Sequence, residues 1–198
     1  MTRTNLVGGD RPLPFTALGD YHKYWIDRDL QIRNEAFDQN HSGRILSVKN
    51  AGHPQHRRNV LHFADWIEDH ISELDLDRPL ELVVVPSCMA NAVGAGLDAI
   101  ATEVARRMKQ VRYRKGSLRR TKSIPKLSAG GNRSLAVHRG SMEFRAAPTA
   151  PRVVVILDDV STTGNSLIAA ADKVRALGSD YYYATSVEAI ALGKTVHD

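Results

Sequence analysis

The sequence contains a single cysteine, Cys88, and no apolar run long enough to cross a membrane as a helix. One cysteine excludes a disulfide framework and a cysteine-rich zinc site within the chain, which fits a reducing compartment. The longest apolar runs are of strand length, far below the roughly 18 residues that a membrane helix needs. The first 14 residues have no apolar segment typical of a secretory signal. These absences predict a cytoplasmic protein without a membrane segment.

Acidic residues are nearly missing from one stretch of the chain. Between Arg106 and Arg145 there are 13 Lys or Arg and a single acid, Glu143, although the whole chain has a formal net charge of only +5. The stretch therefore carries +12 and the remainder −7. One interpretation is a solvated basic face. The other is a site for a polyanion, either nucleic acid or a small phosphorylated ligand. Composition alone leaves both open.

The apolar pattern predicts an α/β domain. The 198 residues, 42% of them hydrophobic, suffice for one such domain with a substantial core. Continuous apolar runs predict buried parallel strands, and an alternating stretch and a β-rich stretch predict two more. Apolar residues at helical spacing predict three helices. The expected strands are 43–50, 81–86, 152–157 and 181–192, and the expected helices are 55–74, 90–109 and 164–177, the last ending at Gly178. This order is typical of a central, mostly parallel, twisted sheet flanked by helices.

Two stretches lack such periodicity. Residues 1–14 are polar and contain two glycines and two prolines, which predicts an irregular arm. Residues 112–150 contain glycines and prolines with little apolar periodicity, which predicts a long functional or disordered loop. Residues 94–99 match the pattern GxGxxA, but the match lies within a helical period and no acid follows at the expected offset. We interpret it as helix packing through small residues.

One motif carries specific chemistry. Residues 152–166 read RVVVILDDVSTTGNS, an apolar strand that leads into two carboxylates, a hydroxyl-rich turn and a helix. Ligands bind beyond the carboxyl ends of strands in open α/β sheets. Gly164 lets the backbone approach a phosphate, and free amides at the helix start favour an anion. Asp158 and Asp159 can accept hydrogen bonds from ribose hydroxyls or hold Mg²⁺ directly or through water. A ribose 5-phosphate unit meets both demands; the alternative is a capped turn with two incidental acids.

The motif resembles the phosphoribosyl pyrophosphate (PRPP) site of type I phosphoribosyltransferases. Looser similarity to ComF-like phosphoribosyltransferase-domain proteins covers most of residues 15–194. It includes TALGDY at 16–21, ILSVKN at 45–50 and the basic run RRTKSIPKLSAGGNRS at 119–134. The N-terminal zinc module of that family has no counterpart here, because one cysteine cannot build it.

The resemblance implies a type I phosphoribosyltransferase fold with a small N-terminal hood and a long flexible basic loop. It implies an arm at 1–14 and one domain at 15–198, with the hood and first helix at 15–80 and the PRPP-binding core at 81–198. Asp158 and Asp159 would hold the ribose hydroxyls and, through them or through water, Mg²⁺. The 5-phosphate would contact Ser161, Thr162, Thr163, Gly164, Asn165 and Ser166. The pyrophosphate would contact the loop Ser87, Cys88, Met89, Ala90 and Asn91. The basic loop would close over the site with Arg120, Lys122 and Lys126 as its catalytic candidates.

The implied activity is Mg²⁺-dependent transfer of the 5-phosphoribosyl group from PRPP to an unidentified nitrogenous base, with release of pyrophosphate. Asp159 is also a candidate to take a proton from the incoming base. A homodimer is expected, since dimers are common in the family and among soluble proteins. Two alternatives stay open. One is a non-catalytic regulator that responds to PRPP or a nucleotide, and the other is a ComF-like, DNA-uptake-associated protein that binds nucleic acid.

Overall fold

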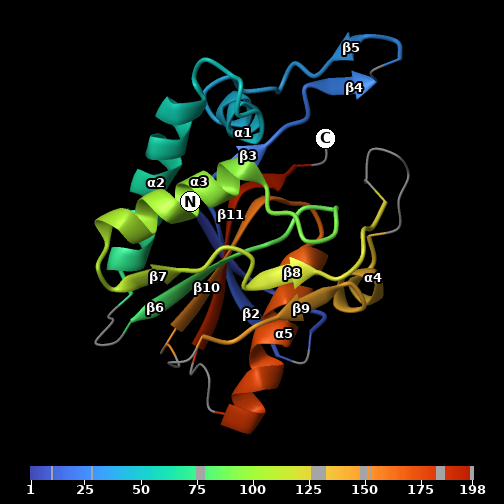
Figure 1. The fold of residues 1–198 in the computed structure, drawn as a ribbon. Coiled ribbons are helices and arrows are strands. Elements are labelled where there is room, and N and C mark those ends of the chain that lie inside the picture. The colour runs from blue at the N-terminus through green and yellow to red at the C-terminus, as the bar shows by residue number, and fades with distance from the viewer. Residues whose placement is uncertain are drawn as a thin grey trace.

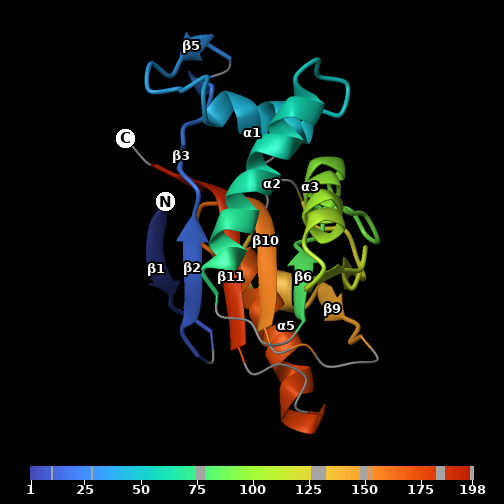
Figure 2. The ribbon, with the colours of Figure 1, turned by 90° about the vertical axis from the view of Figure 1, so that its left-hand side faces the viewer.

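The computed structural model describes residues 1–9, 11–27, 29–74, 79–125, 133–147, 151, 153–181 and 186–196. Its central sheet has seven strands, and every pairing in it is parallel except that of the first two strands. Figure 2 shows most of this order across the sheet. The order is β1 (Thr2–Leu6), β2 (Leu13–Ala17), β11 (Ser186–Thr195), β10 (Val153–Ser161), β6 (Leu80–Val84) and β7 (Val111–Tyr113), with β3 (Asp20–Tyr21) paired to β11. The predicted α/β fold with a mostly parallel sheet is confirmed.

Helices cover both faces of the sheet. On β10, Val153, Val155 and Leu157 pack into one apolar cluster, and Val154 and Ile156 pack into another. Such alternation is what a strand buried on both faces requires. The first cluster is completed by α1 (Ser42–Lys49), α2 (His56–Ser72) and α3 (Ala95–Arg107). The second is completed by α5 (Asn165–Tyr181), which lies on the other side of the sheet in Figure 1.

The sequence predicts a strand at 43–50, and that prediction was wrong, because these residues form most of the helix α1. Ile45 and Val48 of α1 are three residues apart and both are fully buried, so the same residues also fit a helical face. Ser47 accepts a hydrogen bond from Asn59 of α2 at 2.6 Å. A helix of eight residues is marginal alone, so its packing on α2 and α3 decides the conformation.

The predicted irregular arm at 1–14 was also wrong. Residues Thr2–Leu6 form β1, which pairs with β2 in an antiparallel register that places Thr2 opposite Ala17. The strand is at the edge of the sheet and its side chains are mostly exposed, so its stability comes from backbone hydrogen bonds. A polar edge strand carries no apolar alternation from which it could be predicted.

The expected long loop at 112–150 is largely ordered in its described part. It contains β7, β8 (Leu118–Arg120), α4 (Leu135–Arg139) and β9 (Met142–Phe144), and β8 pairs antiparallel with β9. Leu118, Met142 and Phe144 pack into the apolar cluster beneath α5. These elements have three to five residues each, which is too short for a periodic pattern.

Other boundaries differ by a few residues. The helix expected at 90–109 begins at Ala95, because residues 87–92 form a turn closed by the Ser87 amide donating to the Ala92 carbonyl. α5 continues through Gly178 to Tyr181, since one glycine inside a helix costs only about 1 kcal/mol. A small hairpin of β4 (Trp25–Asp27) and β5 (Ile32–Arg33) stands apart from the sheet in Figure 1. Among the described helices, none is long and apolar enough to span a membrane.

The GxGxxA match is a packing contact, as predicted. A Cβ added at Gly96 would lie 2.2 Å from the Val48 carbonyl oxygen, so only glycine allows α1 and α3 to meet at this point. The residue after Val48 is Lys49, the last residue of α1.

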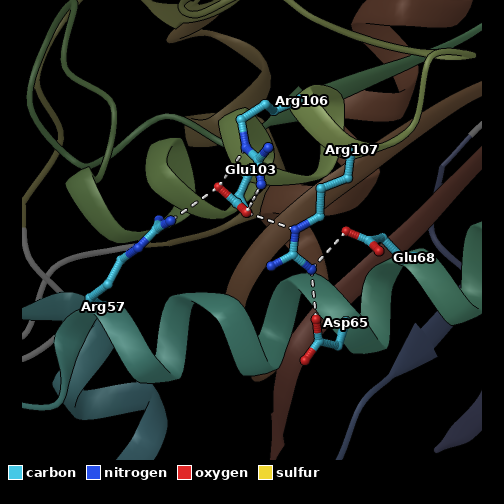
Figure 3. A network of polar contacts seen from close by, with 6 residues as sticks. All are labelled: Arg57, Asp65, Glu68, Glu103, Arg106 and Arg107. Atoms are coloured by element: carbon cyan, nitrogen blue, oxygen red, sulfur yellow. Dashed lines mark hydrogen bonds and ion pairs between the residues drawn. The ribbon is translucent and has the colours of Figure 1, made fainter.

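A charged network holds α2 against α3 (Figure 3). Glu103 is buried and accepts hydrogen bonds at 2.7 Å from both Arg106 and Arg107. The hydrogen bond from Arg106, and after it the one from Arg107, has the largest effect on Glu103, and together they lower its pKa to about 2. Arg107 also donates to two carboxylates of α2. The six members are Arg57, Asp65, Glu68, Glu103, Arg106 and Arg107.

Candidate active site

A cleft opens where the chain path divides across the sheet. From β6 the chain passes through α3 to β7 at one edge, and from β10 it passes through α5 to β11 in the opposite direction. The crevice beyond the carboxyl ends of two such strands is the usual ligand site of an open α/β sheet. A cavity of about 610 Å³ lies there. Its polar and charged lining residues are Tyr21, Lys23, Lys49, Ser87, Cys88, Arg120, Arg133, Asp158, Asp159, Thr162, Ser166 and Thr195.

Asp158 lines the cleft and is 8% exposed. Its carboxylate accepts hydrogen bonds from the Ser166 hydroxyl at 2.7 Å and from the Asp159 amide at 2.8 Å. Burial, reinforced by the charge of Asp159, raises the pKa of Asp158 to about 6. The side chain is therefore a strong acceptor held in a costly charged state, which a ligand with hydroxyl donors would relieve.

Asp159 forms an ion pair with Lys49, whose Nζ lies 3.1 Å from Oδ2. Both side chains are about one-third exposed. The Lys49 Nζ also lies 5.8 Å from the centre of the Tyr21 ring. The acid pair is therefore flanked by a cation from the N-terminal part of the chain.

The turn after β10 presents unused donors. α5 begins at Asn165, and its first amides have no intrahelical acceptor. Gly164 has a φ of +77°, and a Cβ there would meet Leu6 at 2.8 Å. Of the six residues predicted to bind the 5-phosphate, Thr162 and Ser166 line the cleft. Ser161 is buried within β10, Thr163 and Gly164 form the turn, and Asn165 is the first residue of α5; none of these four lines the cleft.

The loop at 87–91 is tied to β8 rather than open. The Asn91 amide donates to the Arg120 carbonyl at 3.0 Å, the Ala90 amide donates to the Ser123 hydroxyl at 3.0 Å, and the Met89 amide donates to the Ser87 hydroxyl at 3.2 Å. Ser87 and Cys88 line the cleft, whereas Met89, Ala90 and Asn91 do not. Four of the five amides of the predicted pyrophosphate loop are thus already engaged within the protein.

Arg120 lines the cleft but is not part of a mobile loop. Its residue is 1% exposed, and its guanidinium donates to the Ser87 carbonyl at 2.7 Å, to the Ser141 hydroxyl at 2.5 Å and to Nδ1 of His138 at 3.0 Å. Burial lowers the pKa of Arg120 to about 10, so it stays charged at neutral pH. The prediction of Arg120 on a flexible lid was wrong, because these contacts fix it to the body of the protein.

The other two basic residues predicted to act in the site are not among the described residues that line the cleft. Lys122 is exposed and does not line the cleft, and Lys126 lies outside the described residues. Arg133 lines the cleft instead. Among the described residues, seven of the 13 basic residues between 106 and 145 form ion pairs with carboxylates, so more than half of these cations have a local acidic partner. These are Arg106, Arg107, Arg114, Lys115, Arg119, Arg139 and Arg145.

The described residues do not fit a metal held by the protein alone. They contain no group of three or more His, Cys, Asp or Glu side chains that could bind one. Asp158 is engaged by Ser166 and Asp159 by Lys49. Mg²⁺ often binds through one or two carboxylates together with substrate phosphates and water, and only that mode fits this acid pair.

Sequence reasoning missed Lys49, Lys23, Arg133 and Thr195. Lys49 was placed on a strand, and on α1 it instead reaches Asp159. Thr195, at the end of β11, shares a hydrogen bond of 2.9 Å with Thr162. Thr195 could have been found from the rule that polar residues at the carboxyl ends of neighbouring parallel strands meet at one edge. No protein-family model matches the chain, and no curated protein has significant sequence similarity to it.

Proposed function

We propose that this cleft binds PRPP and that the protein transfers the 5-phosphoribosyl group to a nitrogenous base, releasing pyrophosphate. One observation carries the proposal: the buried Asp158 and the partly exposed Asp159 line one cleft together with two groups of residues that can bind an anion, here called its walls, at the point where the chain path divides. The first wall is the start of α5 with Thr162 and Ser166, and the second is Arg120 with Arg133. A ligand for this cleft needs hydroxyl groups at its centre and phosphates on both sides.

PRPP has this arrangement of groups. Its ribose hydroxyls would donate to Asp158 and Asp159, and its 5-phosphate would accept from the free amides of α5 and the Thr162 hydroxyl. Its pyrophosphate would lie beside Arg120 and Arg133. On this proposal the sheet, the cleft and the N-terminal elements above it form a type I phosphoribosyltransferase fold, with α1 and the β4–β5 hairpin in the hood.

The proposed reaction breaks the bond between ribose C1 and the pyrophosphate oxygen, and the electron pair leaves with the pyrophosphate. The lone pair of the acceptor nitrogen forms the new bond to C1, and the proton on that nitrogen passes to a base, for which Asp159 is the candidate. Arg120 is fixed before the reaction, so the charge that develops on the pyrophosphate meets a donor that needs no rearrangement. Mg²⁺ would arrive with the pyrophosphate and neutralise part of its charge.

A non-catalytic regulator that binds PRPP is the second candidate. It is favoured by the loop at 87–91, whose amides are largely used within the protein and would give the pyrophosphate few backbone donors. A nucleic-acid-binding role has less support, because most of the basic stretch is paired with carboxylates.

Turnover measurements separate these candidates. The protein, PRPP and Mg²⁺ are combined with a panel of purines, pyrimidines and pyridine carboxylates, and pyrophosphate release is followed. An enzyme releases pyrophosphate with at least one base, whereas a regulator is stabilised by PRPP, by about 2.7 kcal/mol at a ligand concentration of 100 Kd, without turnover. Absence of affinity for PRPP and for every ribose 5-phosphate nucleotide tested would contradict both. Nucleic-acid binding would instead fall steeply with salt.

A further inference from the structure

Arg120 is a buried cation without an ion pair to any described carboxylate, although the charge of Asp158, which lines the same cleft, favours its charged form. Its side chain is among the largest that are fully buried, and no carboxylate within the described part of the chain forms an ion pair with it. Arginine is rarely buried unless it is paired, because an uncompensated charge in the interior is costly. Its partners are instead three neutral acceptors, the Ser87 carbonyl, the Ser141 hydroxyl and the His138 ring.

The Arg120 guanidinium has N–H groups that its three neutral partners do not use. It has five N–H groups in a fixed plane, and three of them donate to these neutral acceptors. The two that remain have no acceptor among the described residues. Since Arg120 lines the cleft, an anion bound there would supply both the missing acceptors and the missing charge.

We propose that His138 is a positioning residue that orients Arg120 toward the pyrophosphate end of the cleft. The identity of this anion rests on the proposed function. A guanidinium can only donate, so Nδ1 of His138 must carry the lone pair and the ring proton must be on Nε2. His138 contacts no ligand in this arrangement; it acts by fixing the plane of the Arg120 fork.

The surroundings of His138 hold it in this state. The residue is 3% exposed, and burial together with the charges of Arg120 and Arg133 lowers its pKa to about 4. Ser141 braces the same arrangement, because its hydroxyl donates to the His138 carbonyl at 3.1 Å while it accepts from Arg120. A neutral imidazole is therefore the form present at physiological pH.

The effect of His138 is confined to one wall of the cleft. Arg120 holds the Ser87 carbonyl through Nε and the Asn91 amide through its own carbonyl, so it fixes both ends of the loop at 87–91. Among the described residues, the start of α5 makes no hydrogen bond to Arg120, His138 or Ser141; its link to this wall is the Asn165 side chain, which donates to the Arg133 carbonyl at 3.1 Å. Loss of the His138 acceptor should therefore weaken pyrophosphate binding selectively.

Calorimetric titration with pyrophosphate and, separately, with ribose 5-phosphate tests this proposal, both with Mg²⁺ present. His138→Leu should weaken pyrophosphate binding about tenfold, the cost of one hydrogen bond to a charged group, and leave ribose 5-phosphate binding within about twofold. His138→Asn should restore most of the pyrophosphate affinity, because the Asn Oδ1 can replace Nδ1 as the acceptor. The matched control is His70→Leu, at another histidine that is 3% exposed but belongs to α2, and it should change neither titration.

Ser141→Ala gives a second test in case His138→Leu does not fold. It removes one of the three acceptors and should weaken pyrophosphate binding about threefold with ribose 5-phosphate binding unchanged. Equal loss of both ligands, unchanged pyrophosphate binding in His138→Leu or in Ser141→Ala, or failure of His138→Asn to exceed His138→Leu would overturn the role of His138. A wild-type protein that binds neither ligand contradicts the proposed function itself, whereas one that binds both, with unaffected variants, contradicts only this inference.

Discussion

Two clusters of charge in this protein are built in opposite ways. In the network between α2 and α3, Glu103 accepts from Arg106 and Arg107, and each cation has a carboxylate within reach (Figure 3). In the cleft, two acids are adjacent, only Asp159 has an ion pair, with Lys49, and the hydrogen-bond acceptors of the buried Arg120 are all neutral. Charge is thus compensated in the first cluster and left partly uncompensated in the second.

This difference in charge compensation indicates that the network between α2 and α3 contributes to stability, whereas the charges of the cleft serve ligand binding. A compensated cluster lowers the free energy of the folded state and has nothing left to offer a ligand. An uncompensated cluster raises that free energy, and a ligand with complementary groups lowers it again. Variants that remove charge should therefore have opposite effects on stability in the two regions.

The largest effect is expected when both cleft acids are neutralised. Asp158→Asn with Asp159→Asn should weaken the binding of ribose 5-phosphate at least about 100-fold, or ~3 kcal/mol, because two charge-assisted hydrogen-bond acceptors are lost. The same double variant should unfold at a higher temperature than the wild type. The substitutions remove the cost of burying the charge of Asp158 and the repulsion between the two carboxylates. Calorimetric titration and thermal unfolding measure the two effects. A double variant that binds normally or is less stable would remove the contrast between the clusters.

The two buried carboxylates, Glu103 and Asp158, should give opposite pH dependence of stability, each worth about 3 kcal/mol. The pKa of Glu103 is lowered to about 2, so its contribution to stability is present above the ordinary carboxyl pKa and is lost as the pH falls toward 2. The pKa of Asp158 is raised to about 6, so its folded state binds more protons than the unfolded chain, and stability falls as the pH rises from about 4 through 6. Denaturant unfolding at a series of pH values, compared with Glu103→Gln and Asp158→Asn, isolates each contribution. Each variant should flatten only its own pH range.

The smallest effect separates the arginines of the network. Arg107 is one-quarter exposed and contacts three carboxylates, so Arg107→Gln should lower the free energy of unfolding by about 1 kcal/mol. Arg106 is two-thirds exposed, and Arg106→Gln should produce no measurable change despite its short contact with Glu103. Equal effects of the two substitutions in chemical denaturation would show that burial does not determine the value of these contacts. Neither variant should alter ligand binding.

The elements that the sequence predicts well are those whose own residues show, by their apolar pattern, which side chains are buried. The run at 153–157 is apolar without interruption because β10 is covered on both faces, and α2 shows a helical stripe from Val60 to Ile71. The acid pair was predicted in the cleft because a strand that ends in polar residues delivers them to the edge of the sheet. None of these predictions needed a distant part of the chain.

The remaining features depend on distant contacts. β1 is a strand because β2 pairs with it, and α1 is a helix because α2 and α3 cover it. Arg120 appears in the sequence as one of many cations in a basic stretch. Its burial follows from contacts with residues 18 to 33 positions away, which no local pattern encodes.

The missing side chain of Gly96 determines where the charge of Lys49 lies. Because no methyl group separates the backbones of α1 and α3 at this position, the end of α1 comes to rest where the next side chain, Lys49, reaches Asp159. A larger residue would push the helix away by the width of a methyl group, and the ammonium group with it. The position of Lys49 beside Asp159 thus depends on a glycine in α3, a helix that contributes only Leu97 to the lining of the cleft.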